Sequence, residues 1–435
     1  MDKTDKSQRI VITGMGLISP LGHTVAESWD NCKNGRSGID WITLFDTSNF
    51  EVKIAGEVKN FDPVSIFGTK EVRRTDRVQQ FALVAAEQAL KDAKINTQDA
   101  SVAREIGCVI GSGIGGITTL VNVLQDYNSR GTRGVGPTQV PQILHDSIAA
   151  RVSINMGLRG PNYDITTACA TGNNAIGDAG DLIRMGRSRY MLVGASEACI
   201  IPMVLAGFYN MKILAQVGPG ETPQQAHKPF DKMRHGFATG EGSGLLVMET
   251  LESALDRGAH IYAEVTGYGH TSDAHHVTAP REDGEGASDS MTRALKDARL
   301  KPEQIDYVNA HGTGTIFNDK SETLALKVAL GEHAYNVPIS STKSMTGHMM
   351  GTAGAAETIF SIMAIHDNFV PPTINLHTPD PDCDLNYTPN VGIAHPIDRV
   401  LNYTAGFGGH NVSLVIERFA EDGLSPNGTD SGASA

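Results

Sequence analysis

Residues 163–183 read YDITTACATGNNAIGDAGDLI, and residues 337–357 read VPISSTKSMTGHMMGTAGAAE. In each stretch a short β-prone segment is followed by a polar turn and then by a run of small residues suited to a closely packed helix. We interpret both stretches as strand–turn–helix units, which are the building blocks of α/β folds.

Two further pairs of segments indicate a duplicated architecture. RIVITGMGLISPLG near the start of the chain resembles HIYAEVTGYGHTSDAH near its middle, and IGCVIGSGIGG resembles IDYVNAHGTGT. Repeats of this kind indicate two units of similar fold, with chance similarity between strand–turn–helix segments as the alternative explanation. The repeats predict two similar halves, residues 1–258 and residues 259–420.

The rest of the chain alternates between β-branched runs and Ala-rich runs, which also favours an α/β fold. We predict strands at residues 9–18, 106–111, 190–194, 244–249, 261–267, 306–309, 337–340 and 412–417. We predict helices at residues 72–93, 142–155, 170–185, 287–298, 320–330 and 354–366.

The composition limits the class of protein. Of the 435 residues 40% are hydrophobic and 20% are charged, as in a globular protein with a large core. No apolar run reaches the length of about 18 residues that membrane insertion requires. The segment MDKTDKSQRIVITG lacks the apolar stretch of a signal peptide, so we expect a cytoplasmic protein. The polar tail, residues 421–435, is predicted to be disordered.

Charge and cysteine content exclude further classes. The net charge of −13 disfavours non-specific binding to nucleic acid. The five cysteines are scattered and form no C-x-x-C pair. The sequence therefore predicts neither a disulfide framework nor a metal site.

The segment DITTACATG places Cys169 between a predicted strand and a predicted helix. The dipole at a helix N-terminus favours the thiolate form of a cysteine, and the free N–H groups there can hold an oxyanion. This arrangement is typical of a nucleophile that attacks a carbonyl carbon. A small buried cysteine that only packs is the alternative.

Three further segments carry candidate polar groups. VNAHGTGT contains His311 before glycines and threonines that could bind an amide-bearing chain, and SSTKSMTGH brings Lys343 close to His348. AGFGGHN encloses Phe407 between glycines, as in a loop that can move. A lysine beside a histidine keeps the imidazole neutral, so that its N–H can donate to a carbonyl oxygen. Taken singly, each segment is more often an ordinary structural turn.

Together, the motifs TACATG, NAHGTGT, STKSMTGH and GFGGHN resemble those of the β-ketoacyl-acyl carrier protein synthases, condensing enzymes of the thiolase superfamily. They occur in the order and at the spacing of that family, and the resemblance extends from Arg9 to about Phe419. It is greatest to the elongating, type II enzymes. The resemblance implies a thiolase-like five-layer αβαβα fold made of two similar halves.

The resemblance also implies a decarboxylative condensation in fatty acid elongation. Cys169 would receive an acyl chain from acyl carrier protein as a thioester. His311 and His348 would promote decarboxylation of malonyl-acyl carrier protein and stabilise the enolate, with Lys343 and Glu357 setting the charge of the histidines. The products would be 3-ketoacyl-acyl carrier protein and CO₂, and no metal or other cofactor would be needed.

Further positions follow from the same resemblance. The backbone N–H groups of Cys169 and Phe407 would form an oxyanion hole, and Phe407 would also gate the acyl pocket. The implied substrate-binding residues line the acyl pocket (Ile114, Phe208), contact the phosphopantetheine arm (Thr313, Thr315) or lie near its tunnel (Thr278).

A basic stripe is expected on the predicted helix 72–93 and just before it. Lys70, Arg73, Arg74 and Arg77 occur at i, i+3, i+4 and i+7, which places them on one helical face. The first three match positions at which the family docks acyl carrier protein, an acidic partner. A solvated helix face is the alternative. The resemblance also implies a homodimer.

The chain departs from the family pattern at three positions. Where the family commonly has NSFGFGG, this chain has NYTAGFGG, so that Ala405 replaces an aromatic residue. Tyr403 stands where an asparagine often helps to hold a monovalent cation, and Asn174 stands near a usual histidine. These changes are compatible with a specialised ketosynthase for polyketides or unusual lipids.

Three other classes agree less well with the sequence. A thiolase would need a second cysteine in a C-x-G turn, whereas the only cysteine after His348 is Cys383, in DPDCDLN. An initiating synthase would have asparagine in place of His348. A non-catalytic chain-length factor would lack the nucleophile, whereas Cys169 is present.

Overall fold

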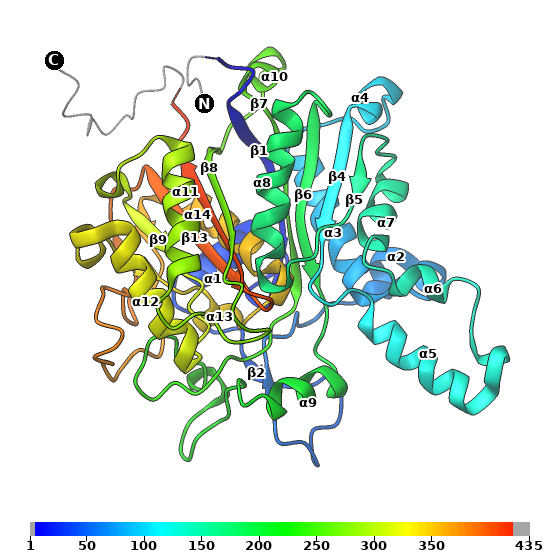
Figure 1. Cartoon of the computed structure of the whole chain (residues 1–435). Coiled ribbons are helices and arrows are strands. Elements are labelled where there is room, and N and C mark those ends of the chain that lie inside the picture. The colour runs from blue at the N-terminus through cyan, green and yellow to red at the C-terminus, as the bar shows by residue number, and fades with distance from the viewer. Residues whose placement is uncertain (1–4, 421–435) are drawn as a thin grey trace.

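The structure is a computed structural model that describes residues 5–420 (Figure 1). The tail predicted to be disordered, residues 421–435, lies outside the described residues. Within the described range, ten strands form one sheet in the order β10-β9-β13-β14-β8-β1-β7-β6-β4-β5. In chain order these strands are β1 (Ile10–Ile18), β4 (Ile106–Gly111), β5 (Asn162–Tyr163), β6 (Tyr190–Glu197), β7 (Gly242–Thr250), β8 (Ala263–Ser272), β9 (Tyr307–Asn309), β10 (Ile339–Ser340), β13 (Arg399–Gly406) and β14 (His410–Glu417).

The two halves of the sheet have the same topology. Numbered one to five along the chain, the five strands of each half lie in the order 3-2-4-5-1. β4 is parallel to β5 and β6, just as β9 is parallel to β10 and β13. The halves meet where β1 and β8 pair, over the three residues Ile10, Val11 and Ile12 of β1. The prediction of an α/β fold from two similar halves is therefore confirmed.

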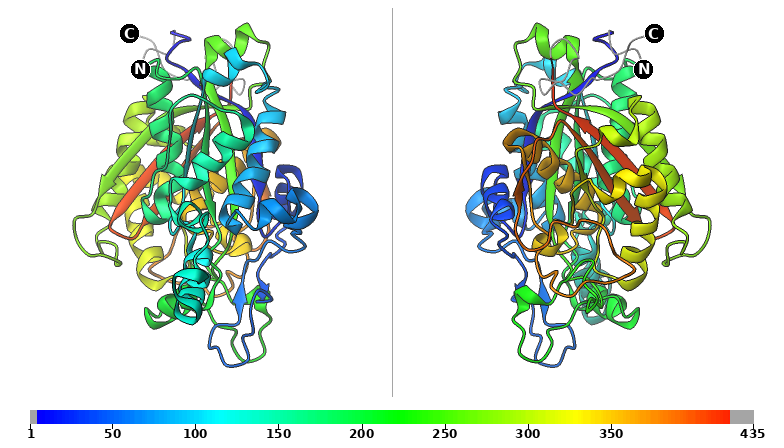
Figure 2. Two further views of the ribbon diagram at one scale, coloured as in Figure 1. Left: turned by 90° about the vertical axis from the view of Figure 1, so that its right-hand side faces the viewer. Right: turned by 90° about the vertical axis from the view of Figure 1, so that its left-hand side faces the viewer.

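Helices pack outside and between the two halves, which gives the five layers αβαβα (Figure 2). The helices of these layers are α3 (Arg77–Asp92), α7 (Ser147–Met156), α8 (Thr171–Arg184), α11 (Glu285–Ala298), α12 (Ile316–Leu330) and α14 (Ala353–Asp367). α3 and α7 cover the first half, and α11 with α12 beside it covers the second. α8 and α14 pack together in the middle, where each contacts strands of both halves.

The close approach of α8 and α14 depends on their small residues. A Cβ atom at Gly172 would lie 2.5 Å from the backbone nitrogen of Ala355, so any larger residue would push the helices apart. Ile176 of α8 and Ile359 of α14 belong to the same buried cluster. The two helices therefore bring their N-terminal turns close together at the centre of the molecule.

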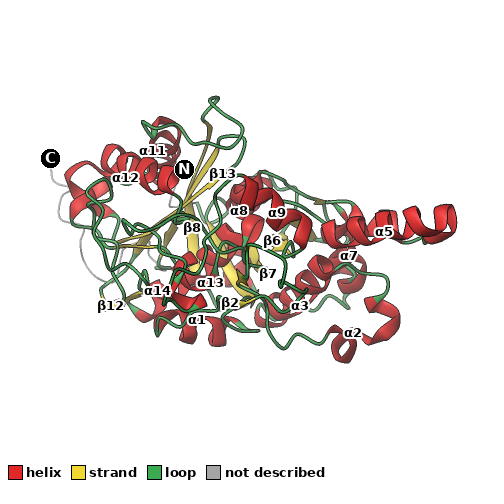
Figure 3. Ribbon diagram, turned by 90° about the horizontal axis from the view of Figure 1, so that it is seen from below, coloured by secondary structure: helices red, strands yellow, loops and turns green. Residues whose placement is uncertain are grey.

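Further helices and short strands occur between these elements. They are α1 (Val25–Lys33), β2 (Asp40–Trp41), β3 (Ile54–Ala55), α2 (Pro63–Val72), α4 (Ala100–Arg104), α5 (Ile117–Arg130), α6 (Gln139–Ile143), α9 (Pro202–Asn210), α10 (Leu251–Asp256), α13 (Lys343–Thr346), β11 (Phe369–Val370) and β12 (Ile393–Ala394). Among these, α5 projects away from the body of the molecule (Figures 1 and 3).

The predicted helix 72–93 is wrong at its start. α2 ends at Val72, and α3 begins at Arg77 after Asp76, whose side chain accepts a hydrogen bond from the N–H of Val78 at 3.1 Å. The chain changes direction between the two helices, so Arg77 does not continue a stripe with the basic residues before it. Its guanidinium forms an ion pair with Glu241 instead, at 2.6 Å.

Two features are absent from residues 5–420. No helix in this range is both long enough and apolar enough to cross a membrane. No group of three or more His, Cys, Asp or Glu side chains in the same range could hold a metal ion.

Candidate active site

Cys169 lies in a tight turn at the start of α8. The turn, Ala168–Ala170, leads directly into the helix. Ala168 has a φ angle of 52°, a left-handed conformation that is strained for a residue with a side chain. From the other side, Gly406 at the end of β13 comes so close that a Cβ atom there would lie 2.4 Å from the carbonyl oxygen of Thr167. Elements of both halves therefore confine the turn.

Two histidines from the second half lie beside the thiol. His348 Nε2 is 3.0 Å from Cys169 Sγ, and the His348 and His311 rings are edge to face with centroids 5.4 Å apart. All three residues are buried. Lys343 of α13 forms a buried ion pair with Glu357 of α14. The fold thus brings together five of the residues to which the family resemblance gave a chemical role: Cys169, His311, His348, Lys343 and Glu357.

Burial controls the charges in this site. Loss of solvent raises the pKa of Cys169 to about 12, although Lys343 and the N–H of Phe407 oppose this shift. Burial, followed by the charge of Lys343, holds the pKa values of His311 and His348 well below their usual range. At neutral pH the resting site therefore contains a thiol and two neutral imidazoles.

The helix N-terminus is expected to favour the thiolate, and burial of the sulfur opposes this effect in the resting site. Lys343 and the backbone N–H of Phe407 lower the pKa of Cys169, as expected for groups that favour an anion, but desolvation of the buried sulfur outweighs them. The nearest acceptor for the thiol proton is His348 Nε2. The geometry therefore suits formation of the thiolate by proton transfer within the site.

Two buried carboxylates that the sequence analysis missed hold the loops of the site. Glu322 accepts hydrogen bonds from the N–H groups of His311 and Gly312, both at 2.7 Å. Glu197 accepts from the N–H of Gly113 at 2.8 Å and from that of the next residue at 3.3 Å, in the equivalent loop of the first half. Burial raises the pKa of Glu322 to about 8 and that of Glu197 to about 7. In the sequence nothing distinguishes these acidic residues from those on the surface.

An apolar cluster adjoins the thiol. Ile114 and Phe208 pack in the same cluster as Cys169. The ring centroid of Phe208 lies 6.5 Å from that of Phe407 and 5.7 Å from that of Phe237. The cluster therefore offers apolar surface to a chain attached at Sγ, at positions that the family resemblance implies.

The expected threonines lie in two loops. Thr313 Oγ1 and Thr315 Oγ1 are 2.9 Å apart in the loop that begins at His311. Thr278 lies in the loop after β8. The carbonyl before Thr278 accepts a hydrogen bond of 2.7 Å from the N–H of Gly408, so this loop touches the one that contains Phe407.

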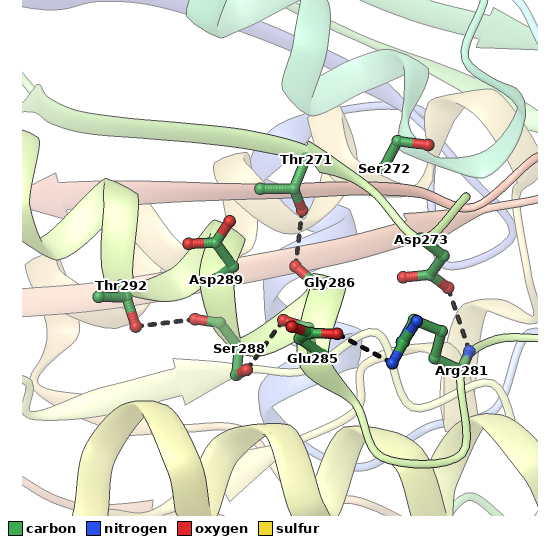
Figure 4. A pocket seen from close by; sticks show the side chains of 9 residues that line it. All are labelled: Thr271, Ser272, Asp273, Arg281, Glu285, Gly286, Ser288, Asp289 and Thr292. Carbon is green, nitrogen blue, oxygen red and sulfur yellow. Dashed lines mark hydrogen bonds and ion pairs between the residues drawn. The ribbon is translucent and has the colours of Figure 1, made fainter. Parts of the chain in front are cut away.

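A pocket of about 570 Å³ lies between β8 and α11 (Figure 4). Its walls are polar: Thr271 Oγ1 donates to the Gly286 carbonyl at 2.6 Å, and Arg281 pairs with Glu285 at 2.9 Å. None of its lining residues belongs to the apolar cluster around Cys169. The pocket is therefore distinct from the surface that suits an acyl chain.

The basic residues Lys70, Arg73 and Arg74 are all exposed. Lys70 lies in the last turn of α2, and the two arginines follow in the connection to α3. They form a short basic segment rather than one face of a continuous helix.

Models of known families match most of the chain. The model "Beta-ketoacyl synthase, N-terminal domain" matches residues 7–254, and "Beta-ketoacyl synthase, C-terminal domain" matches residues 262–377. The chain belongs to the beta-ketoacyl synthase family. Among curated members of this family, "3-oxoacyl-[acyl-carrier-protein] synthase 2" of Synechocystis sp. is 46% identical over 414 residues, which are 95% of this chain and 99% of that protein. The protein of the same name from Staphylococcus aureus strain N315 has the same identity and coverage.

Solved beta-ketoacyl synthase structures are also similar. A ketosynthase in complex with a type II polyketide acyl-carrier protein has a TM-score of 0.88 and 35% identity, over 95% of this chain and 99% of that one. A beta-ketoacyl synthase from Burkholderia phymatum has a TM-score of 0.87 and 33% identity, over 95% of this chain and all of that one. The thiolase-like fold expected from the motifs is therefore confirmed.

Proposed function

We propose that the protein is a 3-oxoacyl-[acyl-carrier-protein] synthase that elongates fatty acyl chains. Acyl-acyl carrier protein transfers its acyl group to Cys169, which gives an acyl-cysteine thioester and releases the carrier thiol. Malonyl-acyl carrier protein then loses CO₂, and the resulting enolate attacks the thioester carbonyl carbon. Cleavage of the carbon–sulfur bond frees Cys169 and gives 3-ketoacyl-acyl carrier protein. Loss of CO₂ drives the reaction, so the proposal needs no metal or other cofactor.

The residues around the thiol have different chemical roles. His348 accepts the proton of Cys169, whose sulfur is 3.0 Å from Nε2, and passes it to the departing thiolate of the carrier. His311 and His348 then donate N–H groups to the malonyl thioester oxygen, which promotes decarboxylation and stabilises the enolate. Burial, followed by the charge of Lys343 in its pair with Glu357, lowers the pKa values of both imidazoles and keeps them neutral.

The remaining positions bind the substrate. Phe407 gates the acyl pocket formed by Ile114 and Phe208, and its N–H joins that of Cys169 in an oxyanion hole. The phosphopantetheine arm contacts hydroxyl groups in the two loops at the entrance: Thr278, Thr313 and Thr315.

The observation that carries this proposal is the contact between His348 Nε2 and Cys169 Sγ, with a second neutral imidazole beside it. A buried thiol next to a base, with apolar surface on one side, suits covalent transfer of an acyl chain. The same contact speaks against a chain-length-factor-like subunit, which binds without reacting.

The proposal includes acyl carrier protein and a second copy of the chain as partners, in the cytoplasm. Lys70, Arg73 and Arg74 are exposed and complement an acidic carrier. The projecting helix α5 (Figure 1) exposes Leu120, Leu124 and other apolar residues, and β5 ends the sheet as an edge strand. A homodimer would cover such a surface.

A ketosynthase of a polyketide or unusual-lipid pathway is the second candidate. Ala405 favours it, because a small residue stands where most elongating synthases carry an aromatic ring beside the site. One of the similar solved structures is a ketosynthase with a type II polyketide acyl-carrier protein, and another is "The ishigamide ketosynthase/chain length factor", each with 35% identity and a TM-score of 0.88.

Intact-protein mass spectrometry after incubation with acyl-acyl carrier proteins of different chain length tests the function. We expect an acyl mass increment that peptide mapping places on Cys169, and that increment should be absent from Cys169→Ala. Cys383→Ser is a matched control, because Cys383 is buried in a different cluster. Absence of an adduct with every fatty acyl chain would contradict the proposal, and an adduct with ketoacyl chains alone would favour the second candidate.

A further inference from the structure

The turn that carries Cys169 is held by its surroundings. Ala168 is left-handed, so the turn is strained and needs contacts that fix it. Inside the turn, the N–H of Thr167 donates to Thr171 Oγ1 at 2.9 Å, and that hydroxyl donates to the carbonyl of Ala168 at 2.7 Å. The hydroxyl of Thr167 makes its bond outside the turn.

That hydroxyl begins a chain of three hydrogen bonds. Thr167 Oγ1 donates to Asn174 Oδ1 at 2.7 Å, and Asn174 Nδ2 donates to Tyr268 Oη at 2.7 Å. The same Nδ2 lies 3.2 Å from His270 Nδ1, a longer contact that also reaches β8. Tyr268 Oη donates to Asp178 Oδ1 at 2.8 Å. Thr167, Asn174 and Asp178 belong to the first half of the molecule, whereas Tyr268 lies on β8 of the second half. The chain therefore ties the Cys169 turn to the opposite half.

The chemistry of the groups sets the direction of every bond. An ionised carboxylate only accepts, so the single hydroxyl proton of Tyr268 points to Asp178. Tyr268 Oη is then free to accept from the amide of Asn174, which turns Asn174 Oδ1 toward Thr167. Asn174 is 1% exposed, so water does not readily replace these partners.

The packing of α8 against β8 makes room for this arrangement. Asn174 and Asp178 are four residues apart and share one face of α8. Gly177 lies beside them, and a Cβ atom there would be 2.4 Å from two atoms of the Tyr268 ring. The ring can therefore reach between the two polar side chains only because residue 177 is glycine.

We propose that Asn174, Tyr268 and Asp178 are positioning residues that hold the Cys169 turn, through Thr167, in the geometry for acyl transfer. This inference rests on the proposed function, in which Cys169 accepts the acyl chain. When these hydrogen bonds are broken, the sulfur and the N–H of Cys169 are less often aligned with the carbonyl group that the sulfur attacks, and acylation slows.

Two variants remove single hydroxyl groups without changing the packing. Tyr268→Phe keeps the ring against Gly177, and Thr167→Val keeps the shape of the side chain. Rapid-quench mass spectrometry with acyl-acyl carrier protein gives the maximal acylation rate and the half-saturating concentration. We expect each variant to lower the maximal rate about five- to tenfold, as for one lost hydrogen bond, with half-saturation unchanged. The double variant should be no slower than the slower single variant, because both break the same chain.

Tyr262→Phe is the matched control. Tyr262 Oη donates to Asp92 Oδ1 at 2.9 Å, so the two form a similar tyrosine–aspartate pair. Tyr262 is among the first residues of the second half, and Asp92 lies on α3. Tyr262→Phe should leave the acylation rate unchanged. A slower rate in Tyr268→Phe then reflects the Cys169 turn and not a general loss of stability.

Several results would overturn the inference. One is a wild-type acylation rate in Tyr268→Phe and Thr167→Val with only a lowered melting temperature, and another is independent, multiplicative effects in the double variant. If Tyr268→Phe does not fold, Thr167→Val decides alone, because an unchanged rate there removes the role of the chain. A wild-type protein that is not acylated at Cys169 would instead refute the proposed function.

Discussion

Replacing Lys343 by methionine tests how a buried cation controls the site. The side chains of Lys343 and Glu357 are at most 3% exposed, and they form an ion pair. Burial already raises the pKa of Glu357, and Lys343 is the group that opposes this shift. In Lys343→Met no cation faces the carboxyl group, so its pKa rises further and the buried acid retains its proton to higher pH.

The size of the effect follows from proton linkage. Removing one partner of a buried ion pair costs about 3–5 kcal/mol of stability if the remaining charge stays ionised. Glu357 can instead stay protonated in the folded state. In the unfolded chain the same carboxyl group loses its proton once the pH exceeds its ordinary pKa. The folded state then binds more protons than the unfolded state, so the free energy of unfolding falls as pH rises, by at most about 1.36 kcal/mol per unit. Between pH 6 and pH 9 the loss therefore reaches up to about 4 kcal/mol.

The double variant Lys343→Met/Glu357→Gln isolates this contribution. Both variants lack the cation of Lys343. The pKa values of the two histidines therefore change in both, and this change does not contribute to the difference between them. The neutral amide does not titrate, and any unsatisfied hydrogen bond it introduces is the same at every pH. We expect the double variant to be more stable than Lys343→Met at pH 9, with the difference shrinking as the pH falls to 6.

Thermal unfolding midpoints of the wild type and the two variants, measured at half-unit steps from pH 6 to pH 9, check this expectation. A difference between the variants that is constant with pH would refute the reasoning, because it would mean that Glu357 does not change its protonation in the folded state. A double variant that is less stable than Lys343→Met at pH 9 would refute it as well.

Three further predictions concern acylation of Cys169, release of CO₂ and binding of acyl carrier protein. Cys169→Ala should form no acyl adduct but should still release CO₂ from malonyl-acyl carrier protein, and loss of both activities would show that the thiol also shapes the decarboxylation site. His311→Ala should slow CO₂ release about 100-fold or more while Cys169 is still acylated, and undiminished CO₂ release would remove its assigned role. Arg73→Glu combined with Arg74→Glu should raise the KM for acyl-acyl carrier protein about tenfold and spare small thioesters. An unchanged KM would mean that these arginines belong to a solvated surface and do not bind the carrier protein.

The architecture was readable in the sequence because its signals are local and repeated. The helices predicted at 170–185 and 354–366 agree closely with α8 and α14. The break before Arg77 was missed although its signal is present, since Asp76 and Gln79 form a capping box. The Ala-rich pattern predicts a single helix over residues 72–93 and does not show that a new helix begins at Arg77.

The charges of the site and its distant supports could not be predicted in the same way. The pKa of Cys169 depends on how completely the sulfur is removed from water, and the sequence shows only that it precedes a helix. Tyr268 reaches Asn174 across 94 positions of the chain, and Glu197 reaches Gly113 across 84. The first contact forms when the two halves pack, and the second forms when β4 and β6 pair within the first half. Neither is visible in the local sequence pattern.

The same strand–turn–helix unit builds both sides of the site. In each half a left-handed residue stands three positions before the central helix: Ala168 (φ 52°) before α8 and Met350 (φ 46°) before α14. The next residue is Cys169 in the first half and Gly351 in the second. The N–H of Gly351 donates to Glu197 at 3.1 Å, so the equivalent turn in the second half takes a structural role.

A difference in loop length then makes the site asymmetric. From the end of β5 to the start of α8 the numbering advances from 163 to 171, and from the end of β10 to the start of α14 it advances from 340 to 353, five residues more. The longer connection includes α13 and carries Lys343 and His348. Because α8 and α14 pack together, that connection lies against the short turn that carries Cys169. Two copies of one unit thereby supply different groups, a nucleophile from one and its base from the other.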